Sequence, residues 1–463
     1  MSEVQLENSN QELTREWQDR DNQHYIHPFT DHKELGHKGA RIITDAEGVY
    51  IRDSEGNEIL DGMAGLWCVN LGYGRQELVE AATRQMQKLP YYNSFFQTAH
   101  PPAIELSAVL GEISPSNFNH AFFTGSGSEA NDTVLKLVRR YWDLMEKPDK
   151  KVVISRKNAY HGSTIAASSL GGMGEMHKQT GVLLPGIEHI EQPHYFELGG
   201  DLSKDEFGLA QAQLLEQKIL QLGADNVAAF IGEPVQGAGG VIIPPDTYWP
   251  EIQRICNQYD ILLIADEVIT GFGRLGEWFG CTRLGIKADL MPFAKGVTSG
   301  YLPLGGVMVS DRVADVVIAK GGEFAHGYTY SGHPAACAVA LENIRLLRDE
   351  GIIDRVRDDT GPYFNQRWAS LGEHSLVGEA RSIGLVGAIE IVADKTTNER
   401  FHKDIGAGGI CRDFCFANGL VMRAVGDAMI VSPPLVMEHT HIDELVEKAW
   451  HCLDLTAETI GAT

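Results

Sequence analysis

Two adjacent carboxylates, Asp266 and Glu267, directly follow the apolar run ILLIA at residues 261–265. A continuous apolar run predicts a strand that is covered on both faces. An unpaired carboxylate at the end of such a strand costs several kcal/mol if it is buried. One of the two side chains therefore needs water or a cationic partner, which the protein or a bound molecule must supply.

Small residues at positions 125–128 precede an amphipathic helical pattern, whose apolar face carries Val134, Leu135, Val138, Tyr141 and Trp142. Free N–H groups at a helix N-terminus form an anion site, most often for phosphate. Capping of the helix by Ser126 or Ser128 explains the same residues, so this motif alone leaves both interpretations open. No Lys-Ser/Thr pair follows at the spacing of a Walker A loop.

A lysine, Lys295, lies between an apolar segment and a Gly/Ser/Thr turn. Most such lysines extend to solvent, but a lysine with a depressed pKa can form a Schiff base with a carbonyl. A phosphate site, a buried aspartate and this lysine together describe the cofactor pyridoxal 5′-phosphate. Its aldehyde would bind Lys295 and its protonated ring nitrogen would bind Asp266.

The pyridinium ring is then the cation that Asp266 needs. Two unit charges about 3 Å apart attract by roughly 5 kcal/mol at an effective dielectric constant near 20. That attraction is enough to keep the ring nitrogen protonated at neutral pH. Glu267 is expected to point to the other side of the strand end.

These residues must be positioned by strands that alternate with helices. Apolar runs are found at residues 120–123, 151–155, 227–231, 261–265 and 306–310. They predict parallel strands in an α/β fold. Polar clusters follow the first four runs, and ligands bind at the carboxyl ends of parallel strands, so we expect these clusters to meet. Residues 185–205 are expected to be a surface excursion.

The C-terminal part, from about residue 336, combines long helical patterns with few strands. We expect a large domain over residues 71–335, and a smaller α+β domain formed by residues 1–70 and 336–463. Two domains are the default for a chain of 463 residues.

Composition excludes several classes of protein. The net charge of −24 argues against a nucleic-acid partner, because phosphate binding needs clustered Lys and Arg. The polar N-terminus is not a signal peptide, and the sequence contains no apolar run long enough for a membrane span. Seven scattered cysteines are typical of free thiols in a reducing cytoplasm.

Six motifs occur in order between residues 120 and 335: GSGSEAN, YHGST, GEPVQGAGG, ADEVITGFGR, AKG and TYSGHP. This set resembles the class III pyridoxal-phosphate aminotransferases of fold type I. The resemblance implies a large domain with a mainly parallel sheet of the seven-stranded type, and a homodimer with active sites at the subunit interface. Dimer and tetramer are not distinguished.

The resemblance also implies roles for individual residues. Gly127 and Ser128 would bind the phosphate, and Thr329 would reach it from the partner subunit. Tyr160 would stack on the pyridine ring and Val268 would pack on its opposite face. Glu233 would lie near the ring hydroxyl.

The segments GMAGLWCVNLGYG (62–74) and MRAVGD (422–427) resemble the ω-amine:pyruvate subgroup, and most of all its putrescine–pyruvate type. By this resemblance Trp67 would line the substrate pocket and Arg423 would bind the carboxylate of pyruvate. Pro292 and Phe293 depart from the small residues that relatives often carry before AKG.

We therefore predict a transaminase that moves the amino group of a primary amine, such as putrescine, to pyruvate. The alternatives with the same cofactor are a β-alanine or 4-aminobutyrate aminotransferase, an aminomutase, a racemase and a decarboxylase. A non-catalytic binding protein would not need intact Lys295, Asp266 and Tyr160.

Three other motifs are given no functional role. GFGRLG at residues 271–276 matches a dinucleotide fingerprint and would suit a dehydrogenase, but no helical pattern follows it. His161 is not needed as a general base, because a freed Lys295 is already placed to move the proton. His24 and His27 lie in a polar arm with no third ligand, so no metal site is predicted.

Overall fold

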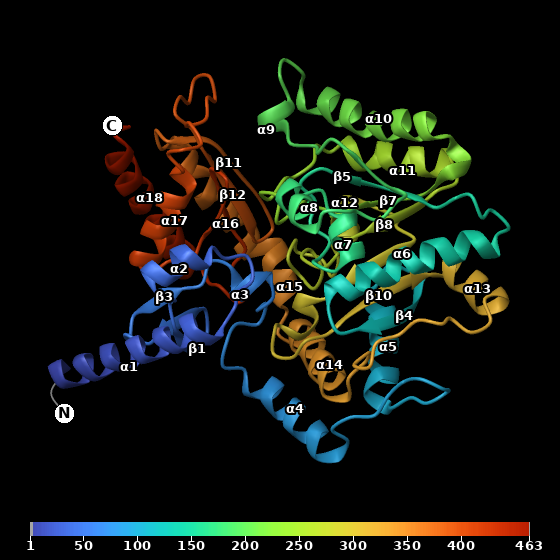
Figure 1. The fold of residues 1–463 in the computed structure, drawn as a ribbon, viewed down its shortest axis with the longest axis horizontal. Helices are drawn as coiled ribbons and strands as arrows, with labels where there is room; N and C mark the ends of the chain where they lie inside the picture. Colours follow the sequence, from blue (N-terminus) through green and yellow to red (C-terminus); the bar gives the residue numbers. More distant parts are fainter. Residues whose placement is uncertain (1–2, 463) are drawn as a thin grey trace.

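The computed structural model describes residues 3–462 and contains a seven-stranded sheet at its centre (Figure 1). The strands in spatial order are β4 (Phe118–Thr124), β10 (Gly305–Ser310), β9 (Leu290–Phe293), β8 (Leu262–Ala265), β7 (Val227–Gly232), β5 (Val152–Arg156) and β6 (Ile187–Ile190). Neighbours from β9 to β6 pair in parallel, whereas β10 is antiparallel to both β4 and β9. The α/β prediction, with a mainly parallel sheet, is confirmed.

All five apolar runs form strands, but the expectation that all five are parallel is wrong for β10. Two strands have no predicted counterpart. β6 lies inside the segment 185–205 that was expected to be a surface excursion; it is a polar edge strand without an apolar run. β9 contains Pro292, which lacks an N–H donor; its carbonyl accepts a hydrogen bond from Glu267 N at 2.9 Å.

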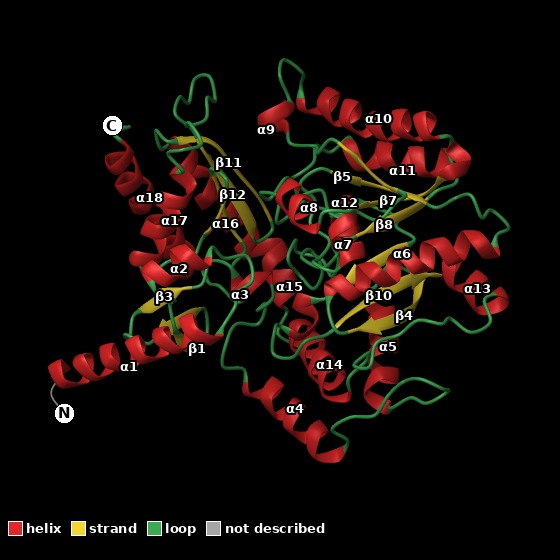
Figure 2. Ribbon diagram, viewed as in Figure 1, coloured by secondary structure: helices red, strands yellow, loops and turns green. Residues whose placement is uncertain are grey.

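Helices cover both faces of this sheet (Figure 2). Helix α6 (Gly127–Leu144) packs on one face, where Val138 and Trp142 contact a layer that includes Ile231 and Ile264. Helices α10 (Lys204–Leu222) and α11 (Tyr248–Gln258) belong to the opposite layer with the alternate strand residues Phe230 and Leu263. Because successive side chains of a strand point to opposite faces, a continuous apolar run is what a sheet covered on both sides requires.

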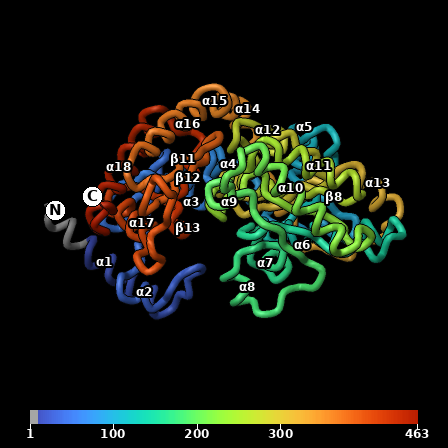
Figure 3. Tube along the Cα trace, turned by 90° about the horizontal axis from the view of Figure 1, so that it is seen from above, coloured from blue at the N-terminus to red at the C-terminus, as the bar shows by residue number. Residues whose placement is uncertain are grey.

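A second, antiparallel sheet is built from C-terminal residues, with strands in the order β11 (Val377–Ile383), β12 (Val386–Ile391), β14 (Ala428–Val431) and β13 (Arg423–Val425). Its helices are α16 (Gly361–Ala369), α17 (Ala407–Ala417) and α18 (His439–Ile460). Both ends of the chain lie on this side of the molecule in two perpendicular views (Figures 1 and 3).

The N-terminal segment forms backbone hydrogen bonds with the stretch that leads from α17 to β13. Its own small sheet contains β1 (Ile43–Glu47), β2 (Tyr50–Asp53) and β3 (Glu58–Leu60). Leu60 N donates to Gly419 O at 3.0 Å, and Val421 N donates to Leu60 O at 2.8 Å. The domain boundaries given above stay a prediction.

Helix α14 (Pro334–Asp349) crosses beneath the large sheet and shares its core layer with α4 (Gln76–Lys88) and α5 (Pro101–Ile113). The remaining helices are α1 (Glu3–His24), α2 (His32–Lys38), α3 (Ala64–Trp67), α7 (Ile165–Leu170), α8 (Gly174–Thr180), α9 (Tyr195–Leu198), α12 (Gly280–Leu284), α13 (Asp311–Lys320) and α15 (Ile352–Arg355). Among residues 3–462, none of the helices combines the length and apolarity that crossing a membrane requires.

Candidate active site

One cavity, of about 120 Å³, lies at the carboxyl ends of the parallel strands. The polar clusters that follow β4, β5, β7 and β8 all contribute to it, as does the segment after β9. The lining residues are Gly127, Ser128, Asn131, Tyr160, His161, Gly162, Glu233, Asp266, Val268, Ile269, Ala294 and Lys295. The structure therefore brings together seven of the ten residues that the sequence singled out.

Asp266 is 3% exposed and is held by neutral or titratable donors rather than by a strong cation. Its Oδ2 accepts from His161 Nδ1 at 2.7 Å and from Asn131 Nδ2 at 2.9 Å, and its Oδ1 accepts from Val268 N at 3.1 Å. Within residues 3–462, no lysine or arginine forms an ion pair with it. The carboxylate is thus oriented by these donors without a lysine or arginine partner.

His161 is a functional candidate whose position the sequence did not predict. Its ring is buried and lies against Asp266. In the described part of the chain, His161 Nε2 and Asn131 Oδ1 are buried without a hydrogen-bond partner. His161 is thereby placed to orient Asp266. Its contact with an aspartate two strands away could not be read from local sequence.

Glu267 points away from the cavity, as expected for the residue that directly follows Asp266 at the end of a strand. Its Oε2 accepts from Thr270 Oγ1 at 2.6 Å and from Gly280 N at 2.9 Å, and its Oε1 accepts from Cys281 N at 2.6 Å. Burial raises the pKa of this carboxyl. Glu267 closes the loop that carries GFGRLG, which adopts turns rather than the strand–helix form of a dinucleotide site.

Lys295 begins a short 3₁₀ helix (Lys295–Thr298) directly after β9. Its φ of +48° lies in the left-handed region that residues other than glycine rarely adopt. Burial lowers the pKa of its amine, and the negative charges of Asp266 and Glu233 oppose that shift only in part. A lysine of this kind is more readily neutral, and so more nucleophilic, than one in water.

The GSGS segment caps helix α6, and the anion site stays a prediction. Ser126 is the N-cap of α6, because its Oγ accepts from Glu129 N at 3.2 Å. The N–H groups of Gly127 and Ser128 have no acceptor among the described residues and remain free for an anion. Gly162, at φ +131°, lies so close that a Cβ there would come within 2.5 Å of Ser128 Oγ.

Glu233 supports the segment that carries Tyr160. Its Oε1 accepts from Tyr160 N at 3.1 Å and its Oε2 accepts from Gly237 N at 2.8 Å. The carboxyl is buried, and burial raises its pKa. The Tyr160 hydroxyl lies 3.1 Å from Ser163 Oγ.

The two predicted substrate residues lie beside the cavity. Trp67 is 2% exposed, has a φ of +65° and packs in the same cluster as Ile269, which lines the cavity. Arg423 lies at the start of β13. Partial burial lowers the pKa of its guanidinium, and the interaction with Tyr160 partly opposes that shift. Its positive charge also lowers the pKa of Lys295. The antiparallel sheet therefore contributes a cation to the cavity region.

Two further residues bear on the site from outside. Thr329 does not line the lysine cavity; it lines a separate cavity of about 850 Å³ with Gly125 and Glu129, on the outer side of the α6 N-terminus. Phe29, in the N-terminal arm, is 75% exposed and its ring lies 6.5 Å from the ring of Tyr160. The sequence did not single out Phe29, because no local pattern connects the arm to Tyr160.

The polar groups that line the cavity fit the functional groups of pyridoxal phosphate. The cavity combines a carboxylate without a strong cation, an amine with a lowered pKa, and free N–H groups at a helix N-terminus. Two buried polar atoms remain without partners at its wall. Each feature matches one functional group of the cofactor.

Comparison with known proteins gives consistent matches over nearly the whole chain. The aminotransferase class-III family matches residues 34–453. The putrescine–pyruvate aminotransferase of Pseudomonas aeruginosa is 62% identical over 449 residues, which cover 97% of this chain and 98% of that protein. The mitochondrial gamma-aminobutyrate transaminase 1 of Oryza sativa subsp. japonica is 41% identical over 455 residues, covering 97% and 85%.

Solved structures show the same fold. An (S)-enantioselective omega-transaminase from Thermomicrobium roseum has a TM-score of 0.92 at 42% identity, covering 96% of this chain and 98% of that one. The omega transaminase from Pseudomonas jessenii in complex with PMP has a TM-score of 0.94 at 39% identity, covering 96% and 99%.

Proposed function

The chain belongs to the class III aminotransferases of fold type I, with pyridoxal phosphate as cofactor, and on this premise we propose that it transfers the amino group of putrescine or a related primary amine to pyruvate. The pairing of Lys295 with an unneutralised Asp266 in one cavity carries the transaminase assignment. The 62% identity to a putrescine–pyruvate aminotransferase supports the substrate pair over 4-aminobutyrate, whose relative is 41% identical.

The cavity residues would hold the cofactor from several sides. The N–H groups of Gly127 and Ser128 would bind the phosphate, and Asp266 would hold the proton on the ring nitrogen. Tyr160 and Val268 would pack on the ring faces, with Glu233 near the ring hydroxyl. When bound, pyridoxal phosphate supplies an electron sink that weakens the C–H bond next to the amine nitrogen.

Lys295 would act at two stages. Its Nζ would bind the cofactor aldehyde in the resting enzyme, and its freed amine would take a proton from the carbon that bears the substrate amine. The lowered pKa supports the second role, because only a neutral amine accepts a proton. His161 would keep Asp266 in place during this transfer.

Arg423 and Trp67 would select the two substrates in turn. The half-buried guanidinium of Arg423 favours a carboxylate partner, which pyruvate and alanine provide. An amine donor without a carboxylate requires Arg423 to turn aside. Trp67, fixed in the cluster with Ile269, would form the apolar wall for the donor chain.

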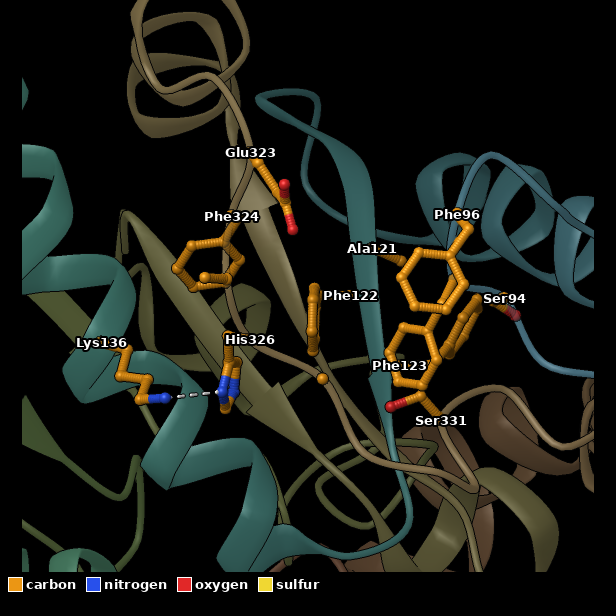
Figure 4. A pocket seen from close by; sticks show the side chains of 13 residues that line it. Ser94, Phe96, Ala121, Phe122, Phe123, Lys136, Glu323, Phe324, His326 and Ser331 are labelled. Atoms are coloured by element: carbon orange, nitrogen blue, oxygen red, sulfur yellow. Dashed lines mark hydrogen bonds between the residues drawn. The ribbon is translucent and has the colours of Figure 1, made fainter.

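We propose that the protein is a homodimer whose partner covers an aromatic surface. A cavity of about 700 Å³ includes Phe96, Phe122, Phe324 and His326 in its lining. Phe122 stacks on His326, and Phe96 and Phe123 lie across from them (Figure 4). Phe96 is 90% exposed and Tyr330 is 66% exposed. Large exposed apolar groups of this kind mark protein interfaces.

The position of Thr329 supports the same proposal. It lies on the outer side of the α6 N-terminus, in the cavity next to this aromatic surface, where it would meet the phosphate site of a partner. A mass measurement in solution tests this: a monomer in the active preparation would contradict it. The seven unpaired thiols support a cytoplasmic location.

The substrate proposal is tested with a panel of amine donors. Alanine formation from pyruvate should be fastest with putrescine or a related diamine and slower with 4-aminobutyrate or β-alanine. A half-reaction separates the other cofactor chemistries, because donor alone should convert the cofactor absorbance to that of pyridoxamine phosphate. If this conversion fails while the donor is isomerised, racemised or decarboxylated, the transaminase proposal is wrong.

A further inference from the structure

The turn that carries Lys295 has an unusual backbone. Lys295 and Ser299, at its two ends, both have a φ of +48°. Side chains other than glycine seldom adopt this conformation, and it persists only where the surroundings hold it. Gly296 is needed for close approach, because a Cβ there would lie 2.5 Å from Asn70 Nδ2. The turn must therefore be held by partners outside itself.

Asn343, in helix α14, provides those partners. It is fully buried. Its Nδ2 donates to Gly296 O and to Val297 O, both at 3.0 Å, and its Oδ1 accepts from Ser299 Oγ at 2.6 Å. Gly296 O also accepts from Ser299 N at 3.2 Å, whereas Val297 O has no backbone donor among residues 3–462. One amide side chain thus hydrogen-bonds to three residues of the lysine turn.

The same contacts extend to the segment of Trp67. Leu71 N donates to Ser299 Oγ at 3.1 Å, so Ser299 connects Asn343 to residues 67–71. Asn70, in that segment, donates to Phe272 O at 2.9 Å and accepts from Arg274 Nη2 at 2.9 Å. Helix α14 itself is anchored in the core against α4 and α5.

We propose that Asn343 is a positioning residue for the reaction: it fixes the backbone at Lys295 and, through Ser299, the segment that presents Trp67. Asn343 is not part of the cavity lining, so it acts only through these backbone groups. The proposal rests on the proposed function, since it assumes that Lys295 and Trp67 meet cofactor and donor.

Three variants separate the two parts of this proposal, the effect of Asn343 on the Lys295 backbone and its effect on the Trp67 segment. Asn343→Leu keeps the approximate volume and removes every hydrogen bond, whereas Asn343→Asp keeps the acceptor for Ser299 but loses both donors. Ser299→Ala removes only the connection to Leu71 and Asn343 Oδ1. Leu347→Ala is the matched control, because Leu347 is fully buried one turn further along α14 and its loss affects packing alone.

The readouts do not depend on turnover. Each variant is saturated with pyridoxal phosphate, its cofactor absorbance is titrated with pH, and the cofactor is trapped with borohydride and mapped to Lys295. We expect the titration midpoint of Asn343→Leu and Asn343→Asp to move by about one pH unit. The fraction trapped on Lys295 should fall roughly tenfold, whereas Leu347→Ala should match the wild type in both.

Steady-state kinetics test the second part. We expect Ser299→Ala to raise the KM for the donor about threefold with an unchanged titration midpoint. If Asn343→Leu does not accumulate as folded protein, Asn343→Asp and Ser299→Ala give the same comparison. A titration midpoint and trapped fraction that stay at wild-type values, with only a lower melting temperature, would show that Asn343 is merely structural. Failure of the proposed function would instead appear in the wild-type enzyme.

Discussion

Two buried carboxylates, Asp266 and Glu390, lie in different regions of the molecule and differ in the cationic groups that surround them. Glu390, in β12, contacts Arg381 and Arg400, each at 2.6 Å, and His194 at 3.2 Å. Asp266 is almost equally buried but has only His161, Asn131 and a backbone N–H. A buried charge needs compensation. Two guanidinium groups compensate the charge of Glu390, whereas no lysine or arginine among residues 3–462 pairs with Asp266.

The comparison also decides what the Glu390 cluster is not. His194, Glu379 and Glu390 lie close enough together to ligate a metal ion. The guanidinium groups of Arg381 and Arg400 already neutralise the carboxylate of Glu390, and a divalent cation would have to displace them. Although burial opposes it, the hydrogen bond from His194 and the charges of Arg381 and Arg400 hold the pKa of Glu390 far below its usual range. Through His194, which follows β6, the cluster also connects β12 to the large sheet.

Lys295→Ala should have the largest effect. The variant loses the amine that we propose binds the cofactor and moves the proton, so alanine formation should fall at least about 10³-fold. The melting temperature should stay near that of the wild type, because the truncated side chain lines the cavity. Alanine release and thermal unfolding measured on the same sample check this, and retained activity would refute the assignment of Lys295.

Asp266→Asn should have the second largest effect, because it keeps the side-chain shape but removes the charge that we propose keeps the ring nitrogen protonated. We expect kcat/KM to fall roughly 10²-fold, with cofactor still bound. Donor half-reactions followed by absorbance measure the loss directly. An unaffected half-reaction would mean that the cavity needs no anion and that the contrast with Glu390 has no functional meaning.

Glu390→Gln should have the opposite profile. Activity should stay within about threefold, but unfolding should cost roughly 3 kcal/mol less, because Arg381 and Arg400 lose their shared partner. The folded pKa of Glu390 is depressed, so its contribution is complete above the unfolded pKa of about 4.3 and declines as the pH falls below it.

Urea unfolding of wild type and Glu390→Gln between about pH 3 and pH 7 tests that sign. The stability difference should be constant in the upper part of this range and shrink toward its acidic end. A difference that grows on acidification would contradict the pairing described above.

Gly162→Ala should have the smallest effect of these substitutions. It changes the shape of the cavity near Ser128, where we propose that the phosphate binds, but it changes no charge. The new Cβ would lie 2.5 Å from Ser128 Oγ, at a φ of +131°. We expect cofactor affinity to fall roughly tenfold, measured by equilibrium titration. Gly174→Ala is the control, because a Cβ at Gly174 meets nothing within 4 Å. Equal affinities would place the phosphate elsewhere.

Much of the site could be predicted because its determinants are local. An apolar run ends where a strand leaves the core, and the residue after it lies at the carboxyl edge, so Asp266 is predicted from its position after a strand. The same argument predicts that the polar clusters around Tyr160 and Glu233 lie at this edge, but the roles of these two residues come from the family resemblance. Lys295 was harder to place, because it follows β9, a strand that contains Pro292 and has no counterpart among the predicted apolar runs.

Residues that act across the fold were missed for one physical reason. The contact of His161 with Asp266, that of Phe29 with Tyr160, and that of Asn343 with the lysine turn each join distant parts of the chain. Contacts of this kind leave no periodic pattern in the sequence of either segment. The antiparallel direction of β10 was missed likewise, because an apolar run does not carry direction.

The sequence by itself determined which residues end the central strands, and so which side chains could serve the cofactor, because apolar periodicity and helix capping are properties of short segments. Only the tertiary structure decided which buried carboxylate is neutralised and which is left for a ligand. Charge compensation depends on what surrounds a group in space, and those neighbours come from every part of the chain.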